Sequence, residues 1–398
     1  MTTPLDARGR ESGNLAARDE GGRKKRQSNA ATGASAAGIR AVSSQFVAFY
    51  FRAPIKAFFR TRVEAVNPRI QANESWSWRM STPGVLAHAV KTYGWSFIPN
   101  NVLPPMIANV TVGAVLYTAY LQALGAIYEP SSHSVKRVYP PAPLASTFSA
   151  GFVAGTFQSV VAAPLDALQI RFQTSDMLEG QYKSMWDYAR HKLHSIGVRG
   201  VFAGWGLSFV KDSFGYGVFF ATFEFIKSQA YYAFVTRYYG RQEPVFTFHR
   251  RRSTIRDDED GNPTIRPHYA LEPSFILFAG ILASIAQQGI QHPLGLVQEV
   301  YYGRLESLDY QAKLEPPHSR MLRLYYRAYE KTYEQCLIQA KRAGGWKRWL
   351  YKGFLVHTLR QVPSTSAGLI VFEIVRRKYG RAEDVISIEK DGHDILLP

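Results

Sequence analysis

The sequence is very poor in cysteine, since Cys336 is the single one among 398 residues. A disulfide needs two thiols and a cysteine-based metal site needs several, so one chain forms neither by itself. The sequence also has no glycine-rich phosphate loop and no His or Cys set with metal-ligand spacing, and "GYG" at 215–217 lacks the third glycine of a dinucleotide fold. We therefore expect no catalytic residue, no metal and no cofactor, and we do not expect an enzyme.

Charged side chains are absent from three long stretches, residues 102–128, 144–165 and 273–298. Each stretch is long enough to cross a lipid bilayer as a helix. Polar residues elsewhere are compatible with this, because helices that line a watery cavity carry polar groups on their inner faces. The sequence predicts an all-α membrane protein, and a soluble all-α protein with buried helices is the alternative.

Positive charge is abundant, with a formal net charge of +17. Such a charge suits nucleic acid, an anionic membrane surface or anionic substrates. The basic residues are scattered through the loops, and no zinc-finger, helix-turn-helix or single-strand-binding pattern is present. We expect a lipid bilayer and a small-molecule substrate as partners, and no nucleic acid.

An order of features occurs twice in the chain. It consists of an uncharged helix, a proline, a polar amphipathic stretch, a glycine just after an aromatic residue, and an apolar helix ending in an aromatic–acid pair. The proline and glycine are Pro164 and Gly204 in one copy, and Pro293 and Gly353 in the other. The later copy is longer, most naturally through an insertion at 303–322. A fainter copy follows Pro54, so three two-helix units predict six spans.

Three short motifs recur at matching places in these copies. "PLDALQIRFQ" holds a proline, an acid two residues later, a base and a glutamine, with Gln169 where a further base would stand. In the second motif, a glycine is followed shortly by an aromatic residue, a base and another glycine. This motif is intact as "YKG" at 351–353 and partly kept as "FAG" at 202–204. An aromatic and an acid followed by a base occur in "FEFIK" and "FEIVRR". This arrangement resembles the mitochondrial carrier family over about residues 45–380.

The resemblance implies a carrier fold with six transmembrane helices in three pseudo-symmetric two-helix repeats. It also implies a monomer in the mitochondrial inner membrane with both termini in the intermembrane space, and cardiolipin as a lipid partner. We expect the following division: a disordered basic tail at 1–44, a degenerate first repeat at 45–130, a second repeat at 144–240, a charged loop insertion at 241–270, a third repeat with a matrix-loop insertion at 271–380, and a C-terminal tail at 381–398.

The resemblance assigns roles to particular residues. Proline kinks would bring helices together at one mouth of the bundle, and charges beyond the kinks would close that mouth as a gate. An acid and a base three residues apart share one helix face and would close the opposite mouth. The expected kinks are at Pro164 and Pro293. The expected gate residues are Asp166, Arg171, Gln173, Glu224, Lys227, Glu373 and Arg376, and the expected substrate contacts are Lys211, Asp212 and Arg360.

Several positions depart from the family pattern. Gly295 stands where the third repeat should have its acid, Gln298 where it should have its base, and Lys56 occupies the acid position of the first repeat. The resemblance implies transport of a small metabolite, amino-acid-like or otherwise anionic or zwitterionic, by alternating access. However, carrier-like proteins of the outer mitochondrial membrane that act in membrane fusion or protein insertion show a comparable loss of motif residues. The alternative is a non-transporting scaffold of a mitochondrial membrane.

Overall fold

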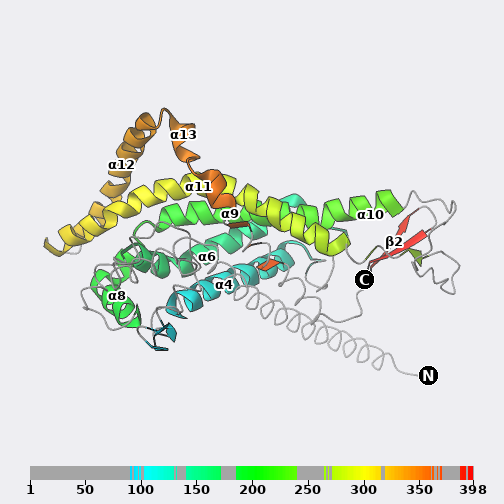
Figure 1. Ribbon diagram of the computed structural model, residues 1–398, viewed down its shortest axis with the longest axis horizontal. Coiled ribbons are helices and arrows are strands. Elements are labelled where there is room, and N and C mark those ends of the chain that lie inside the picture. The colour runs from blue at the N-terminus through cyan, green and yellow to red at the C-terminus, as the bar shows by residue number, and fades with distance from the viewer. Residues whose placement is uncertain are drawn as a thin grey trace, which may run out of the picture.

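The computed structural model is an elongated helical bundle (Figure 1). It describes the following residues: 90–91, 94–96, 98–99, 103–129, 131, 140–171, 185–239, 264–265, 268, 271–314, 319–359, 361–362, 365, 368–369, 386–390 and 393–397. The N-terminal tail, most of the first repeat before residue 103, Gln173, Arg360, Glu373 and Arg376 lie outside the described residues.

The bundle is built from long apolar helices that run along its long axis (Figure 1). They are α4 (Leu103–Ile127), α6 (Leu144–Arg171), α9 (Trp205–Glu224) and α11 (Leu271–Leu314). Helix α9 packs against both α6 and α11, and α4 packs against α6. Within the part of the chain that the structure describes, three segments are long and apolar enough to cross a membrane, namely Ile107–Ile127, Leu144–Asp166 and Leu271–Arg304. These match the three uncharged stretches, so the predicted all-α membrane bundle is confirmed; the count of six spans stays a prediction.

The remaining elements lie around this bundle. Helix α9 continues through a π-helical segment η4 (Phe225–Ala230) into α10 (Tyr231–Tyr239), so that one rod extends from 205 to 239. Helix α8 (Met185–Val201) lies near the end of α6. Helices α12 (Ser319–Arg342) and α13 (Trp346–Leu350) form an arm beside α11 at that same end of the bundle (Figure 1).

Small residues allow α6 and α9 to pack closely. A Cβ added to Gly155 would lie 2.6 Å from the Asp212 carbonyl oxygen, and one added to Gly151 would lie 2.7 Å from that of Tyr216. Ala150 and Ala154 on the same face are fully buried. The sequence pattern of small residues one turn apart thus marks a true helix interface. In α11, Ala279 and Ala283 are likewise buried in the main core.

Aromatic rings fill the space between α4 and α9. Tyr120 stacks on Phe220 with ring centroids 3.7 Å apart, and Tyr117 meets the same ring edge-on at 5.3 Å. Phe219 and Phe220 are each only 1% exposed. These rings bury a large apolar area, and their edge-on and stacked geometries add to it. These rings thereby hold α4 against α9.

Pro164 and Pro293, the expected kinks, lie inside α6 and α11, and both helices continue beyond the proline. The predicted kink itself stays a prediction. The insertion at 303–322 is for the most part not a loop, because α11 runs to Leu314 and α12 begins at Ser319. Residues 305–314 are rich in good helix formers, and helix formation stops just before "PP" at 316–317.

A small sheet forms where the sequence predicted only a loop and a tail. Strand β1 (Thr264–Ile265) pairs in parallel with β3 (His393–Leu397), and β3 pairs antiparallel with β2 (Ile386–Lys390). The strand order is β1-β3-β2. Figure 1 places the sheet beyond the end of α10, outside the helical bundle. The insertion at 241–270 therefore contributes one strand and the tail at 381–398 contributes two. Their pairing is too distant in sequence for local patterns to reveal.

The close contact between α6 and α9 can be tested with Gly155→Ala. The new methyl group would press on the backbone of Asp212, which cannot rotate away, so we expect a loss of about 1–3 kcal/mol in stability. Thermal unfolding in detergent, followed by tryptophan fluorescence, should show a lower Tm. Gly289→Ala is the matched control, because a Cβ there meets nothing within 4 Å. Equal Tm values for the two variants would contradict the predicted packing.

The single thiol is expected to react slowly in the folded protein. Cys336 is 2% exposed and packs with Ala340 and Trp349. Burial raises the pKa of its thiol, although nearby Arg304 acts in the opposite direction. A raised pKa leaves less of the reactive thiolate at neutral pH, so alkylation by iodoacetamide should accelerate as the pH rises. Mass spectrometry should show slower labelling at pH 7 than in unfolded protein; equal rates would contradict this burial.

Candidate substrate site

Charged and polar side chains meet between α6, α9 and α11. Lys211 and Asp212 come from the first half of α9, and the side chain of Asp212 is only 9% exposed. Their charged groups lie 3.8 Å apart, so two of the predicted substrate contacts pair with each other. An ionisable pair inside a helical bundle that crosses a membrane is costly and marks a candidate functional site.

Lys211 has a closer partner on α11. Its ammonium nitrogen donates a 2.7 Å hydrogen bond to Oε1 of Gln298 on α11. Gln298 occupies the position where the family pattern has a base. An arginine or lysine at 298 would repel Lys211, whereas an amide offers it an acceptor. The departure seen in the sequence is therefore structurally matched to the lysine on α9.

The amide nitrogen of Gln298 completes a small network. It donates to the Ser208 hydroxyl at 2.5 Å and to the hydroxyl of Tyr302, one helical turn further along α11. The two hydroxyls also lie 3.0 Å from each other. Gln298 is 3% exposed and Ser208 is 1% exposed. Because Lys211 can only donate, the amide oxygen must face it, which fixes the orientation of Gln298.

A second glutamine on α11 contacts the acid of the pair. Nε2 of Gln291 donates to Oδ1 of Asp212 at 3.3 Å. The Gln291 side chain lies over Gly215, where an added Cβ would come within 2.4 Å of it. A side chain at 215 would thus displace Gln291. Gly215, the first glycine of "GYG", therefore has a packing role within α9.

Asp166, the acid just past Pro164, joins the same cluster from α6. It interacts with the charge of Lys211 and hydrogen-bonds Ser208. Both neighbours belong to its own repeat. Its link to the third repeat runs through Lys211 and Ser208 to Gln298. A direct pairing of Asp166 with a residue of another repeat stays a prediction. The side chain of Arg171 and all of Gln173 lie outside what the structure describes.

The predicted gate residues at the far end of α9 also interact locally. Glu224 and Lys227 form an ion pair at 3.6 Å within one rod, where α9 passes into η4. Ser228 donates to the Glu224 carboxylate at 2.7 Å, and Lys227 lies over the Phe223 ring. π-Helical segments occur frequently at functional sites, so η4 is consistent with a functional role for Glu224 and Lys227. The expected partners Glu373 and Arg376 lie outside the described residues, so pairing between helices stays a prediction.

The glycine motif has the same backbone form in two repeats. Gly204 and Gly353 adopt left-handed φ values of 83° and 76°. Gly204 directly precedes α9 as its N-cap, and Gly353 precedes the helical turn at 354–359. Tyr351 donates to the Gly289 carbonyl at 3.1 Å, and the Lys352 carbonyl lies 3.0 Å from Nε2 of His292. In both copies the glycine therefore lies in a turn just before a helix. In the later copy, Tyr351 and Lys352 also join this turn to α11.

Comparisons with known proteins point the same way as this geometry. Residues 140–232, which include α6, α8, α9 and η4, match the family model described as mitochondrial carrier protein. The chain is also 25% identical over 197 residues to Solute carrier family 25 member 45 of Mus musculus. Both findings support a member of the mitochondrial carrier family. That alignment covers 45% of this chain and 63% of the relative's length.

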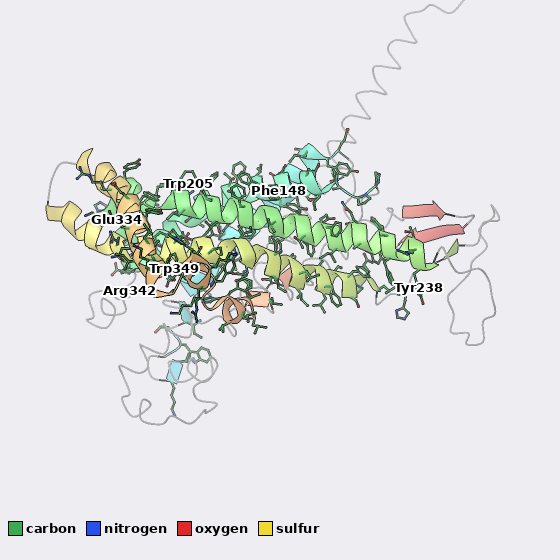
Figure 2. All side chains as sticks on the ribbon, turned by 90° about the horizontal axis from the view of Figure 1, so that it is seen from above. Phe148, Trp205, Tyr238, Glu334, Arg342 and Trp349 are labelled. Atoms are coloured by element: carbon green, nitrogen blue, oxygen red, sulfur yellow. The ribbon has the colours of Figure 1, made fainter. Side chains whose placement is uncertain are left out.

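Within this cluster, sequence reasoning found Lys211 and Asp212 but missed the neutral residues that hold them. Ser208, Gln291 and Tyr302 were absent from the predicted site, and Gln298 was seen only as a lost base. A signal was present, since Gln291, Gln298 and Tyr302 are spaced by seven and four residues and so share one face of α11. The arrangement offers one cation, two carboxylates and several neutral donors and acceptors (Figure 2 shows the neighbouring helices with their side chains).

Proposed function

We propose that this protein is a mitochondrial membrane carrier that moves a small amino-acid-like metabolite by alternating access. The observation that supports this most is the cluster of Lys211, Asp212 and Asp166 between three helices of the bundle. The family resemblance implies substrate contacts at Lys211 and Asp212, and a gate residue at Asp166. The resemblance further favours the inner membrane, with the chain acting as a monomer.

The charges of the cluster favour a zwitterion over a dicarboxylate. Asp166 and Asp212 both lie near Lys211, so the described side chains already include more acid than base. A dicarboxylate would bring two more negative charges to them, at a cost that rises in a partly dry site. An amino acid brings one charge of each sign, and its ammonium group can pair with Asp212 or Asp166. We propose that Arg360 supplies a further contact, as the motif spacing implies.

Uptake into liposomes tests this function directly. Purified protein, screened with labelled amino acids, nucleotides, carboxylates and phosphate, should exchange an amino acid. Lys211→Ala should lower that exchange by about 10- to 100-fold, the value of a hydrogen bond to a charged group. Lys341→Ala, on the exposed face of α12, should leave it unchanged. A wild-type protein that exchanges no substrate class would instead favour the non-transporting scaffold.

Charge reversal tests the proposed gate at the end of α9. Glu224→Lys and Lys227→Glu should each slow exchange by up to about fivefold, the value of one partly exposed ion pair. The double swap keeps the pair within the rod and should recover most of the loss. If Arg376→Glu rescues Glu224→Lys better than the swap does, the pairing between helices is the functional one. Unchanged exchange in both single variants would remove these residues from the gate.

A further inference from the structure

Lys211 is held by a neutral group of the protein itself. Its nearest partner is the Gln298 amide oxygen at 2.7 Å, while the Asp212 carboxylate is further away at 3.8 Å. The Gln298 amide therefore occupies the direction in which the Lys211 ammonium makes its best hydrogen bond. Any substrate acceptor that binds Lys211 along this direction must first displace Gln298.

A carboxylate is the substrate group best suited to displace Gln298 from Lys211. A hydrogen bond between an ammonium and a carboxylate is stronger than one between an ammonium and an amide. The hydroxyl of Tyr302 now accepts from the Gln298 amide nitrogen, but a hydroxyl can also donate once that nitrogen leaves. Lys211 and Tyr302 would then present two donors from two different helices to one carboxylate group. Ser208 stays engaged through Asp166.

We propose that Gln298 is an internal substitute for the substrate carboxylate, occupying Lys211 and Tyr302 in the empty carrier and leaving them when an amino acid binds. This deepens the proposed function and rests on it. Gln298 is then a specificity-determining residue, although the sequence pattern marks it as a lost gate charge. Its exchange with the substrate also links binding to the contact between α9 and α11, because Gln298 joins these helices in the empty state.

The proposal predicts opposite effects for two substitutions at one position. Gln298→Ala removes the internal competitor, so KM for the exchanged amino acid should fall by about three- to tenfold. Gln298→Glu replaces it with a permanent carboxylate, so KM should rise by about tenfold or more. A position that only supports packing would impair both variants in the same direction. Gln335→Glu, on the exposed face of α12, is the control for added charge and should leave KM unchanged.

The experiment measures uptake into liposomes and thermal shift in detergent, with labelled lysine, alanine and glutamate as probes. Opposite KM shifts, accompanied by a larger thermal shift in Gln298→Ala and a smaller one in Gln298→Glu, support the proposal. If wild-type protein exchanges a probe but the two variants shift KM alike or not at all, the role of Gln298 is wrong and transport still stands. If wild-type protein neither exchanges nor is stabilised by any probe, the proposed function fails and this inference fails with it.

Discussion

The close approach of α6 and α9 is the constraint on which the rest of the bundle depends. It requires glycine at 151 and 155, because the facing atoms at Tyr216 and Asp212 are backbone atoms that cannot move aside. This contact brings Asp166 of α6 close to Ser208 and Lys211 of α9. Helix α11 also packs against α9 and adds Gln298. The polar cluster is thus a consequence of how near the two helices of one repeat can come.

The loss of charge in the third repeat has a physical counterpart in the structure. Where the family pattern has an acid and a base, this chain has Gly295 and Gln298. Gln298 does not leave a gap, since it accepts from Lys211 and donates to two hydroxyls. Neutral hydrogen bonds hold the helices together with less dependence on salt than exposed ion pairs have. Decay of a charge motif is therefore compatible with a working contact between repeats.

The insertion at 303–322 and the segments at 241–270 and 381–398 add helices and strands around the bundle. Residues added after α11's membrane span lengthen α11 and α12, and with α13 they form an arm beside the bundle (Figure 1). The arm packs through Tyr301, Ala328 and Tyr329 at its start and through Cys336 and Trp349 further on. At the other end, β1 joins the loop between repeats to the C-terminal hairpin. These additions leave the α6, α9 and α11 contact intact.

The sequence by itself determined the membrane helices, because runs of uncharged residues have few other places to be stable. It also determined the second repeat and the position of Lys211 and Asp212, since motif spacing along a helix is a local property. Only the tertiary structure decided that these two residues pair, that Gln298 faces Lys211, and that Gln291 lies over Gly215. The contacts of Gln298 and Gln291 with α9 join residues 87 and 79 positions apart. Their geometry depends on how closely the helices pack, which no local pattern records.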